Sequence, residues 1–561
     1  MKSKFIKNFL LLTFSTLIIN IIEMVTNVYI TNKIGTTVLG SYSLIMNVFN
    51  FLVTISLFGI PLAITKLVSE NDELKKDKAI EMSSKIACKI CAIISVLVCI
   101  FTVLNRDLLV SFFLHNSTSS DIFIILGASL PFIALTSCFC GYFNALRKVN
   151  KPVSYEFLTH VIRSTTIIVL LKLAFPAYKT FAIGLFLSEF ISFLYSYKLF
   201  KKDIKYYAAS KEKVVKKTIV KDIFRISLPL SFTTFVRSGL STLKHTLIPL
   251  RLQKFGFSYD FALSRYGIIH GIALPFILMP SIFINSAASL LLPEYSRYFA
   301  SNNTEKIKKL TEKIFKLTIN ISLYISFIIY IASDYICFKL YNNIEVSYYV
   351  KILTPLICII YLDYIADSIL RGLDLQVSVM KINILDLIIS ITLIYFGIPY
   401  LGTWGYILVL YVSEYLNGLM SINQILNKAR INFKYFEWII KPLTCLFTSF
   451  FILKLLHITT NNIMEVIICV LIFTLIFLFL QFLSYKKESW FFLSRLFLFY
   501  FEYLYILSTF AASAEFSSPS PFKSANSKSF WVGLLYLYFS STIAASAEFT
   551  IPSVLISPSI I

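Results

Sequence analysis

Long apolar segments separated by short polar stretches fill most of the chain. A helix that spans a bilayer needs about 20 mostly apolar residues, and about fourteen segments meet this requirement. They are 9–30, 41–65, 83–104, 122–145, 153–171, 181–200, 223–250, 266–293, 314–331, 350–370, 380–396, 403–424, 437–454 and 464–484. Strands of a membrane barrel would instead alternate apolar and polar residues. The pattern predicts an all-α polytopic membrane protein with about fourteen transmembrane helices.

Composition and charge agree with this prediction. Of the 561 residues, 57% are hydrophobic and 15% are charged, which argues against an ordinary soluble enzyme. The net charge is +22, and the basic residues gather in alternate short loops. Basic loops lie on the cytoplasmic side of a membrane, which explains this charge without a nucleic-acid partner. We therefore expect a multi-pass cell-membrane protein with its N-terminus in the cytoplasm and no bound nucleic acid.

The longest basic loop divides the predicted helices into two sets of six. A six-plus-six plan is typical of transporters whose two repeats face each other across a cavity at the bilayer midplane. The expected regions are an N-terminal six-helix lobe at 1–200, a basic cytoplasmic linker at 201–222, a C-terminal six-helix lobe at 223–424, two additional helices at 425–485 and an atypical tail outside the fold at 486–561.

Ionisable residues inside the first predicted lobe are candidates for function, since each costs about 2.5–3.5 kcal/mol near a helix centre. Glu156, His160 and Arg163 are spaced i, i+4 and i+7, which places them on one helix face. Two interpretations remain open: a Glu156–Arg163 pair that neutralises itself locally, or a polar stripe that faces a watery cavity. Glu23 belongs to a second polar stripe in the first span.

Two cations lie seven residues apart in the seventh predicted span, which also places them on one face. Arg237 and Lys244 have no acidic residue on their own stretch of helix. Their charges require an anion from another helix, a lipid phosphate or a substrate. This pattern favours side chains that line a cavity, and we predict that Arg163, Arg237 and Lys244 bind substrate.

Acidic residues mark the second predicted lobe. Asp363 and Asp367 share a face of the tenth span, while Asp386 and Glu414 are isolated in the next two spans. Such acids either bind a coupling cation or pair with basic residues on neighbouring helices. Asp363 and Asp367, together with Glu23, Glu156 and His160, are therefore candidates for a supporting or ion-coupling role.

The sequence lacks the patterns of common enzymes. It has no phosphate-binding Walker loop, no GxSxG and no HExxH. Cys88 and Cys91 form a CxxC, but no second cysteine or histidine pair accompanies it, so we interpret them as small buried apolar residues. We predict no catalytic residues, no metal site and no cofactor. Pro61, Pro229 and the pair at 275 and 280 predict bends in their helices.

Several segments resemble the polysaccharide biosynthesis flippases, and best the stage V sporulation protein B group of the multidrug/oligosaccharidyl-lipid/polysaccharide exporter superfamily. The resemblance covers about 5–485. It is carried by IGTTVLGSYSLI (34–45), FGIPLAITKLVSE (58–70), GYFNALRKVNKPVSYEFLTHVIR (141–163), RISLPLSFTTFVRSGLSTLKHTLIPLRLQ (225–253) and YGIIHGIALPFILMPSIFINSAASLLLPEYSRYFA (266–300).

The resemblance implies two six-helix lobes in a V around a central cavity, with two extra helices. It also implies transport of an undecaprenyl-pyrophosphate-linked precursor, such as a lipid-linked oligosaccharide or a lipid II-like molecule, for spore cortex peptidoglycan. The three predicted cations would suit the pyrophosphate, and other partners would be membrane lipids and a coupling cation. The alternatives are a cation-coupled multidrug exporter of the same fold and a non-transporting scaffold for cell-wall synthesis. A membrane-embedded glycosyl-transfer enzyme is disfavoured, because the outer loops lack paired acids.

Overall fold

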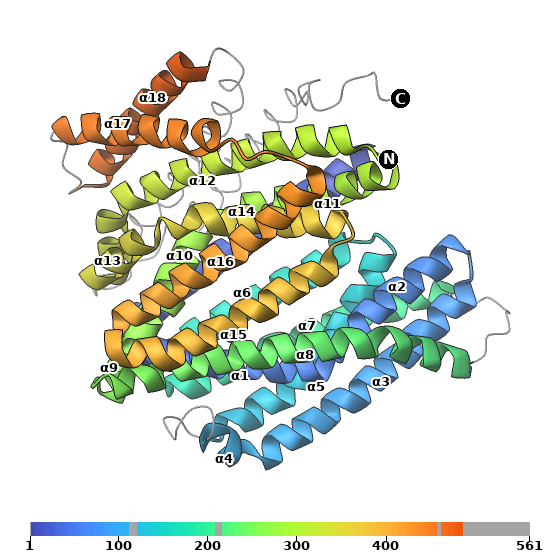
Figure 1. Cartoon of the computed structure of the whole chain (residues 1–561). Coiled ribbons are helices and arrows are strands. Elements are labelled where there is room, and N and C mark those ends of the chain that lie inside the picture. Colours follow the sequence, from blue (N-terminus) through green and yellow to red (C-terminus); the bar gives the residue numbers. More distant parts are fainter. Residues whose placement is uncertain (1, 112–119, 208–215, 457–461, 486–561) are drawn as a thin grey trace, which may run out of the picture. The chain divides into compact units, whose positions relative to one another are not determined.

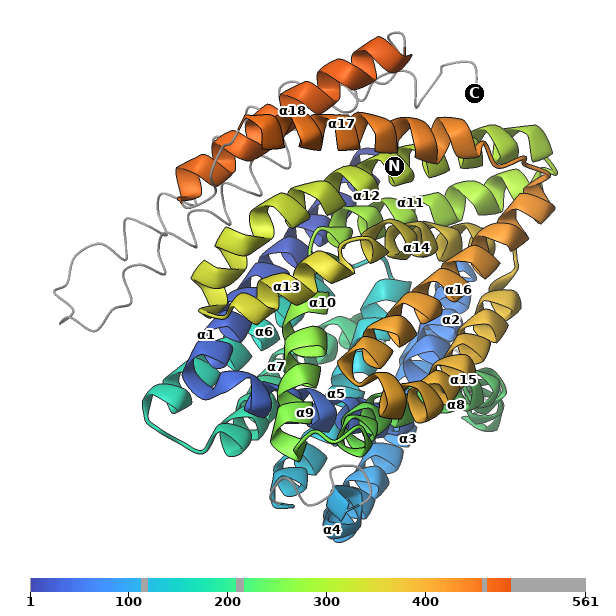
Figure 2. The ribbon, with the colours of Figure 1, turned by 60° about the vertical axis from the view of Figure 1, so that its left-hand side comes forward.

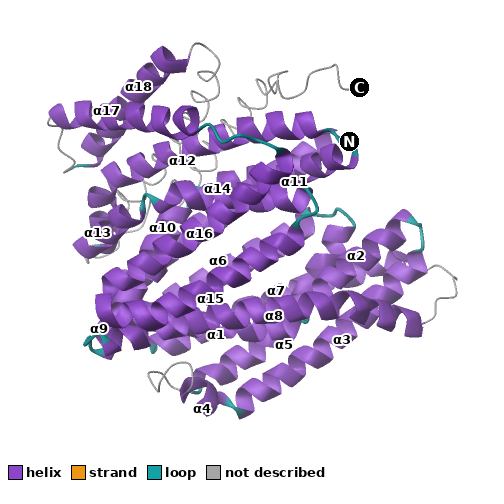
Figure 3. Cartoon of the chain, in the orientation of Figure 1, coloured by secondary structure: helices purple, strands orange, loops and turns teal. Residues whose placement is uncertain are grey.

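The computed structural model describes residues 2–111, 120–207, 216–456 and 462–485, with side chains from Thr13 to Leu483. These residues belong to one compact unit, Met1–Ser508. Within them the structure is helical without a strand, and helices lie over all fourteen predicted segments (Figure 3). The all-α membrane fold is confirmed. Nine of the described helices are long and apolar enough to cross a membrane, or ten if one bent pair counts as a span, so the count of fourteen stays a prediction.

The helices that precede the basic loop pack together as a first set. α5 packs against α2, α3 and α7, while α6 packs against α7 and α1 (Figure 1). Burial of aliphatic and aromatic side chains, such as Tyr142 and Phe139 of α5, holds this set together. Its members are α1 (Lys2–Leu57), α2 (Ile60–Glu73), α3 (Asp77–Leu104), α4 (Arg106–Leu109), α5 (Ile122–Ala145), α6 (Asn150–Lys172) and α7 (Ala177–Tyr207).

The helices that follow the basic loop form a second set. α15 packs against α8 and α16, α14 packs against α11 and α16, and α17 and α18 pack against each other and against α12 (Figures 1 and 2). Its members are α8 (Lys216–Lys254), α9 (Tyr259–Tyr266), the π-helix η2 (Gly267–Ala273), α10 (Leu274–Leu278), α11 (Ser281–Ala300), α12 (Thr304–Tyr341), α13 (Ile344–Leu353), α14 (Leu356–Gly372), α15 (Gln376–Leu401), α16 (Thr403–Ala429), η3 (Phe436–Ile440), α17 (Lys441–Leu455) and α18 (Ile463–Tyr485).

Breaks in the helices occur near residues that cannot continue a regular helix. Gly35, with φ of 82°, separates the first two predicted spans inside α1. Phe58 and Gly59 have positive φ between α1 and α2, and Pro61 then fits the first turn of α2, where its missing N–H is not needed. The predicted eighth span is divided into α9, η2, α10 and α11, with Pro280 between the last two. Helices therefore break near Pro61 and Pro280, whereas α8 continues through Pro229, and the bends expected at these prolines stay a prediction.

The two sets touch along α1 and α8. α8 packs against α1, α2 and α3 as well as against α15, and α1 packs against α9 and η2. Helices α7 and α8 extend into the predicted linker, and residues 208–215 between them lie outside the described part of the chain, as does the predicted tail at 486–561. The division into two six-helix lobes and two extra helices stays a prediction.

Candidate functional site

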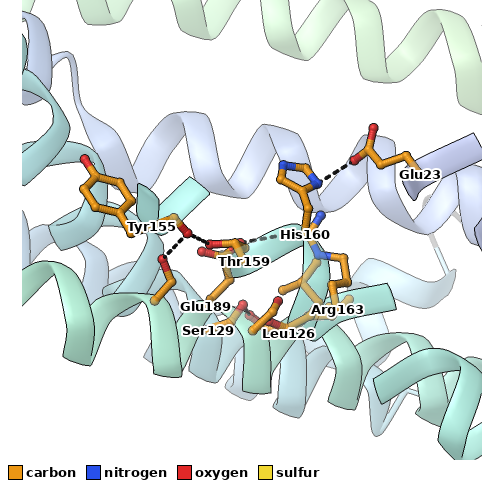
Figure 4. A network of polar contacts seen from close by, with 11 residues as sticks. Glu23, Leu126, Ser129, Tyr155, Thr159, His160, Arg163 and Glu189 are labelled. Atoms are coloured by element: carbon orange, nitrogen blue, oxygen red, sulfur yellow. Dashed lines mark hydrogen bonds and ion pairs between the residues drawn. The ribbon is translucent and has the colours of Figure 1, made fainter. Parts of the chain in front are cut away.

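A polar network joins α1, α6 and α7 in the first set (Figure 4). The Arg163 guanidinium donates a hydrogen bond to Glu189 Oε1 on α7 over 2.7 Å. The two side chains are 23% and 13% exposed, so they form a largely buried ion pair. Glu189 was not among the predicted residues, although it is the one acid of the 181–200 segment and could have been noticed on that basis. Arg163 is therefore compensated inside the protein.

His160 and Glu23 form the second contact of this network. Glu23 Oε1 lies 2.9 Å from His160 Nδ1, which connects α1 to α6 (Figure 4). Arg163 acts electrostatically on Glu23 as well. The structure therefore brings together three of the predicted residues, one turn apart on α6 and across from α1. Glu156 is exposed and does not pair with Arg163, so the local Glu156–Arg163 pair considered from the sequence is wrong.

The two predicted cations of α8 have different surroundings. Lys244 donates to Ser413 Oγ on α16 over 3.1 Å, and that hydroxyl donates to Asp386 Oδ1 on α15 over 2.7 Å. Arg237 is exposed and lies within electrostatic range of Asp367. Within the described residues neither Lys244 nor Arg237 forms an ion pair. Another helix therefore supplies a distant acid, and neither cation is held directly by a carboxylate.

The predicted acids gather between α14, α15 and α16. Asn417 Nδ2 donates to Asp363 Oδ2 over 3.1 Å, and the other oxygen of this buried carboxyl has no hydrogen-bond partner in the described structure. Asp386 and Glu414 act electrostatically on Asp363. Arg371 of the same helix donates to Asp367 Oδ2 over 3.1 Å, so the basic partner of Asp367 lies on its own helix and not on a neighbouring one.

The eight predicted residues therefore fall into two groups. The first set holds Glu23, Glu156, His160 and Arg163, whereas the second set holds Arg237, Lys244, Asp363 and Asp367. A surface hollow of about 330 Å³ lies at one end of α8, lined by Leu247, Leu250, Arg251, Gln253 and Lys254. No predicted site residue lines this hollow, and the central cavity stays a prediction, as do the substrate-binding and ion-coupling roles.

Two family models and a protein of known sequence match much of the chain. The family model described as "Polysaccharide biosynthesis protein" matches residues 5–299, and a second model, MatE, matches residues 259–396. Stage V sporulation protein B of Bacillus subtilis (strain 168) is 22% identical over 451 residues, which cover 78% of this chain and 86% of the relative.

Two solved structures show the same fold. The lipid II flippase MurJ in an inward closed conformation superposes with a TM-score of 0.66 at 16% identity, over 84% of this chain and 98% of MurJ. The MATE transporter VcmN of Vibrio cholerae superposes with a TM-score of 0.57 at 14% identity, over 78% of this chain and 100% of VcmN. At these identities the likeness concerns the arrangement of helices. It does not transfer a substrate.

Proposed function

This chain belongs to the polysaccharide biosynthesis protein family, and we propose that it is a flippase for a lipid-linked sugar precursor. The precursor is an undecaprenyl-pyrophosphate-linked molecule that crosses the cytoplasmic membrane by alternating access. Its cell-wall product is spore cortex peptidoglycan. Support comes from a curated relative that is a sporulation protein and from a structural neighbour that is a lipid II flippase.

One observation carries the proposal: Arg237 and Lys244 place two positive charges on one face of α8, and no described carboxylate pairs with either. A pyrophosphate has several oxygens that accept charge-assisted hydrogen bonds, and a guanidinium can bind two of them at once. Such bonds would offset the cost of removing these cations from water. The prenyl chain would stay in the bilayer while the headgroup crosses beside α8.

The sharpest test is transport in liposomes that contain the purified full chain and a fluorescent lipid-linked precursor. We expect Arg237→Ala to lower the transport rate at least about tenfold, as the loss of one charged hydrogen bond of about 1.5–3 kcal/mol implies. Arg225→Ala removes another exposed cation of the same helix, closer to its beginning, and is the matched control that should keep the parent rate.

Two results would count against the proposal. If liposomes with the parent protein transported the precursor no faster than liposomes without protein, a non-transporting scaffold would be favoured. Equal rates in Arg237→Ala, Lys244→Ala and the parent would show that the α8 cations do not bind the headgroup. Complementation of a flippase-deficient sporulating strain, with the amount of protein in the membrane measured by blotting, tests the proposed role in the spore cortex.

A cation-coupled multidrug exporter is the second candidate. The acids between α14 and α16 favour it, because a carboxyl with a free oxygen such as that of Asp363 suits a coupling cation. The MatE match at 259–396 also covers part of this region. Dye efflux from liposomes under an imposed sodium or proton gradient, lost in Asp363→Asn, would support this function over the flippase.

A further inference from the structure

Two histidines face each other where α8 meets η2. The ring centroids of His245 and His270 are 4.3 Å apart. The ring of Tyr266 stacks on His270 at 5.1 Å, and its hydroxyl lies 3.2 Å from His245 Nδ1. None of the proposed transport steps uses these three side chains. They lie beside α1, because Asn47 of α1 reaches the same hydroxyl.

The hydrogen bonds around His245 suit a neutral ring. Asn47 Nδ2 donates to the carbonyl oxygen of Ser43 over 2.8 Å, which fixes the direction of its amide, and it also donates to the Tyr266 hydroxyl over 3.2 Å. The single proton of that hydroxyl is therefore free to point to His245 Nδ1. A ring nitrogen accepts a hydrogen bond only when it carries no proton. The Asn47–Tyr266–His245 chain therefore uses every proton and acceptor when His245 Nδ1 carries no proton.

Adding a proton to Nδ1 would break this chain. A protonated Nδ1 becomes a donor, so the Tyr266 hydroxyl would have to turn and its own proton would lose an acceptor. The buried Nδ1 of His270 has no hydrogen-bond partner in the described structure, so it can take up a proton without losing a bond. In either ring the new charge would face a second imidazole at 4.3 Å. The pair can therefore hold one extra proton more easily than two.

The charged and titratable groups around the pair oppose a further positive charge. Lys244 of α8 acts electrostatically on both histidines, while Tyr266 and Tyr406 are the titratable neighbours from α9 and α16. The facing group from α1 is the neutral Asn47. Helix α13 also packs against η2, but its Glu345 and Lys351 pair with Arg265 and Asp334.

We propose that His245 and His270 form a proton-binding site that controls the contact of α1 with α8 and α9. The contact is closed when both rings are neutral, and it opens when a proton reaches His245 Nδ1 and breaks the Asn47–Tyr266–His245 chain. The same contact includes the 2.7 Å hydrogen bond between Thr36 of α1 and Ser264 of α9. The site adds a pH response to the proposed function and does not depend on which substrate the protein carries.

Disulfide cross-linking measures this contact without any substrate. Thr36→Cys and Ser264→Cys place two thiols where the hydroxyls now touch, and copper phenanthroline oxidises them in the full chain in liposomes. Lowering the pH from about 8 to about 4.5 should reduce the yield severalfold, and most of this fall should come below the ordinary histidine value of about 6.5, because Lys244 and the facing imidazole oppose the added charge. Adding His245→Gln, whose amide oxygen still accepts from Tyr266, should abolish this fall.

A control pair corrects for the pH dependence of thiol oxidation itself. Ser347→Cys and Asp334→Cys join two positions within the second set, where the Ser347 hydroxyl now donates to the Asp334 carboxylate. A Thr36–Ser264 yield that follows the control pair at every pH would overturn the proposal, even if the His245→Gln protein failed to fold. A fall that persists unchanged in both His245→Gln and His270→Gln would overturn it as well.

Discussion

Arg163 and Glu189 show how a single side chain acquires a partner that its own helix cannot supply. The sequence places Glu156 seven residues before Arg163, but the 2.7 Å contact goes to α7 instead. Both side chains are largely buried, and loss of one partner would leave the other as an uncompensated charge. Removing both charges together distinguishes two roles for Arg163. A purely structural pair can be replaced without loss of transport, whereas a residue that binds substrate cannot.

We expect Glu189→Gln to lower the stability of the protein by about 3 kcal/mol, since an isolated buried charge is costly. The double variant Arg163→Leu/Glu189→Leu should recover most of this loss, because it removes both charges. Thermal unfolding in detergent measures both effects. If the double variant is stable and transports at the parent rate, Arg163 does not bind substrate and the predicted role for it is wrong.

At the residue scale, the sequence could predict that intramembrane charges matter but not how they pair. The spacing within a helix follows from the 3.6-residue period, so Glu156, His160 and Arg163 were correctly placed on one stretch of helix. The partners Glu23, Glu189 and Ser413 come from other helices, and their approach depends on tertiary packing that a single sequence does not encode locally.

Among the helices, the crossing of α1 with α9 and η2 is unusually close. A Cβ atom on Gly40 would lie 2.1 Å from the carbonyl oxygen of Leu263, and one on Gly267 would lie 2.3 Å from that of Thr36. Small residues let helix backbones approach in membranes. Hydrogen bonds from Asn27 to Gly271 and between Thr36 and Ser264 cross the same contact.

Gly40→Ala should push α1 away from α9, because the new methyl group would meet backbone that cannot rotate aside. We expect a loss of stability of about 1–3 kcal/mol, as is usual for overpacking. Gly397→Ala is the matched control: it lies inside α15 with no atom within 4 Å of the added carbon. Equal melting temperatures for the two variants would show that the crossing is looser than the structure indicates.

The helices themselves were largely predictable, because apolar length and proline are local signals. The segment 122–145 coincides with α5, and Pro61 and Pro280 mark real breaks. The 54° bend between α13 and α14 and the π-helix η2 were not predicted. Both depend on how neighbouring helices pack, which the hydropathy of the segment does not reveal.

For the whole molecule, orientation in the membrane is the main prediction that stays open. Basic loops alternate along the sequence and predict a cytoplasmic N-terminus. The loop after α8 should then face outward and the loop after α11 should face the cytoplasm. The exposed residues Lys254 and Ser301 lie at these two loops.

Labelling of intact cells with a membrane-impermeant maleimide distinguishes the two orientations. We expect Lys254→Cys to be labelled and Ser301→Cys to be labelled only after the cells are broken. The unsubstituted chain measures the background from its nine native cysteines. The reverse labelling pattern would invert the assignment of every loop, and it would do so without affecting the fold.

Helix α8 has a consequence for any cycle in which the two sets separate. It packs against α1, α2 and α3 of the first set and against α15 of the second, so it cannot remain fixed to both sets during such a movement. Whichever set α8 leaves, Arg237 and Lys244 would move with it, and the charged groups near these two side chains would change. Binding of the substrate would then be coupled to the movement of the helices, because the helix that moves also carries the two cations.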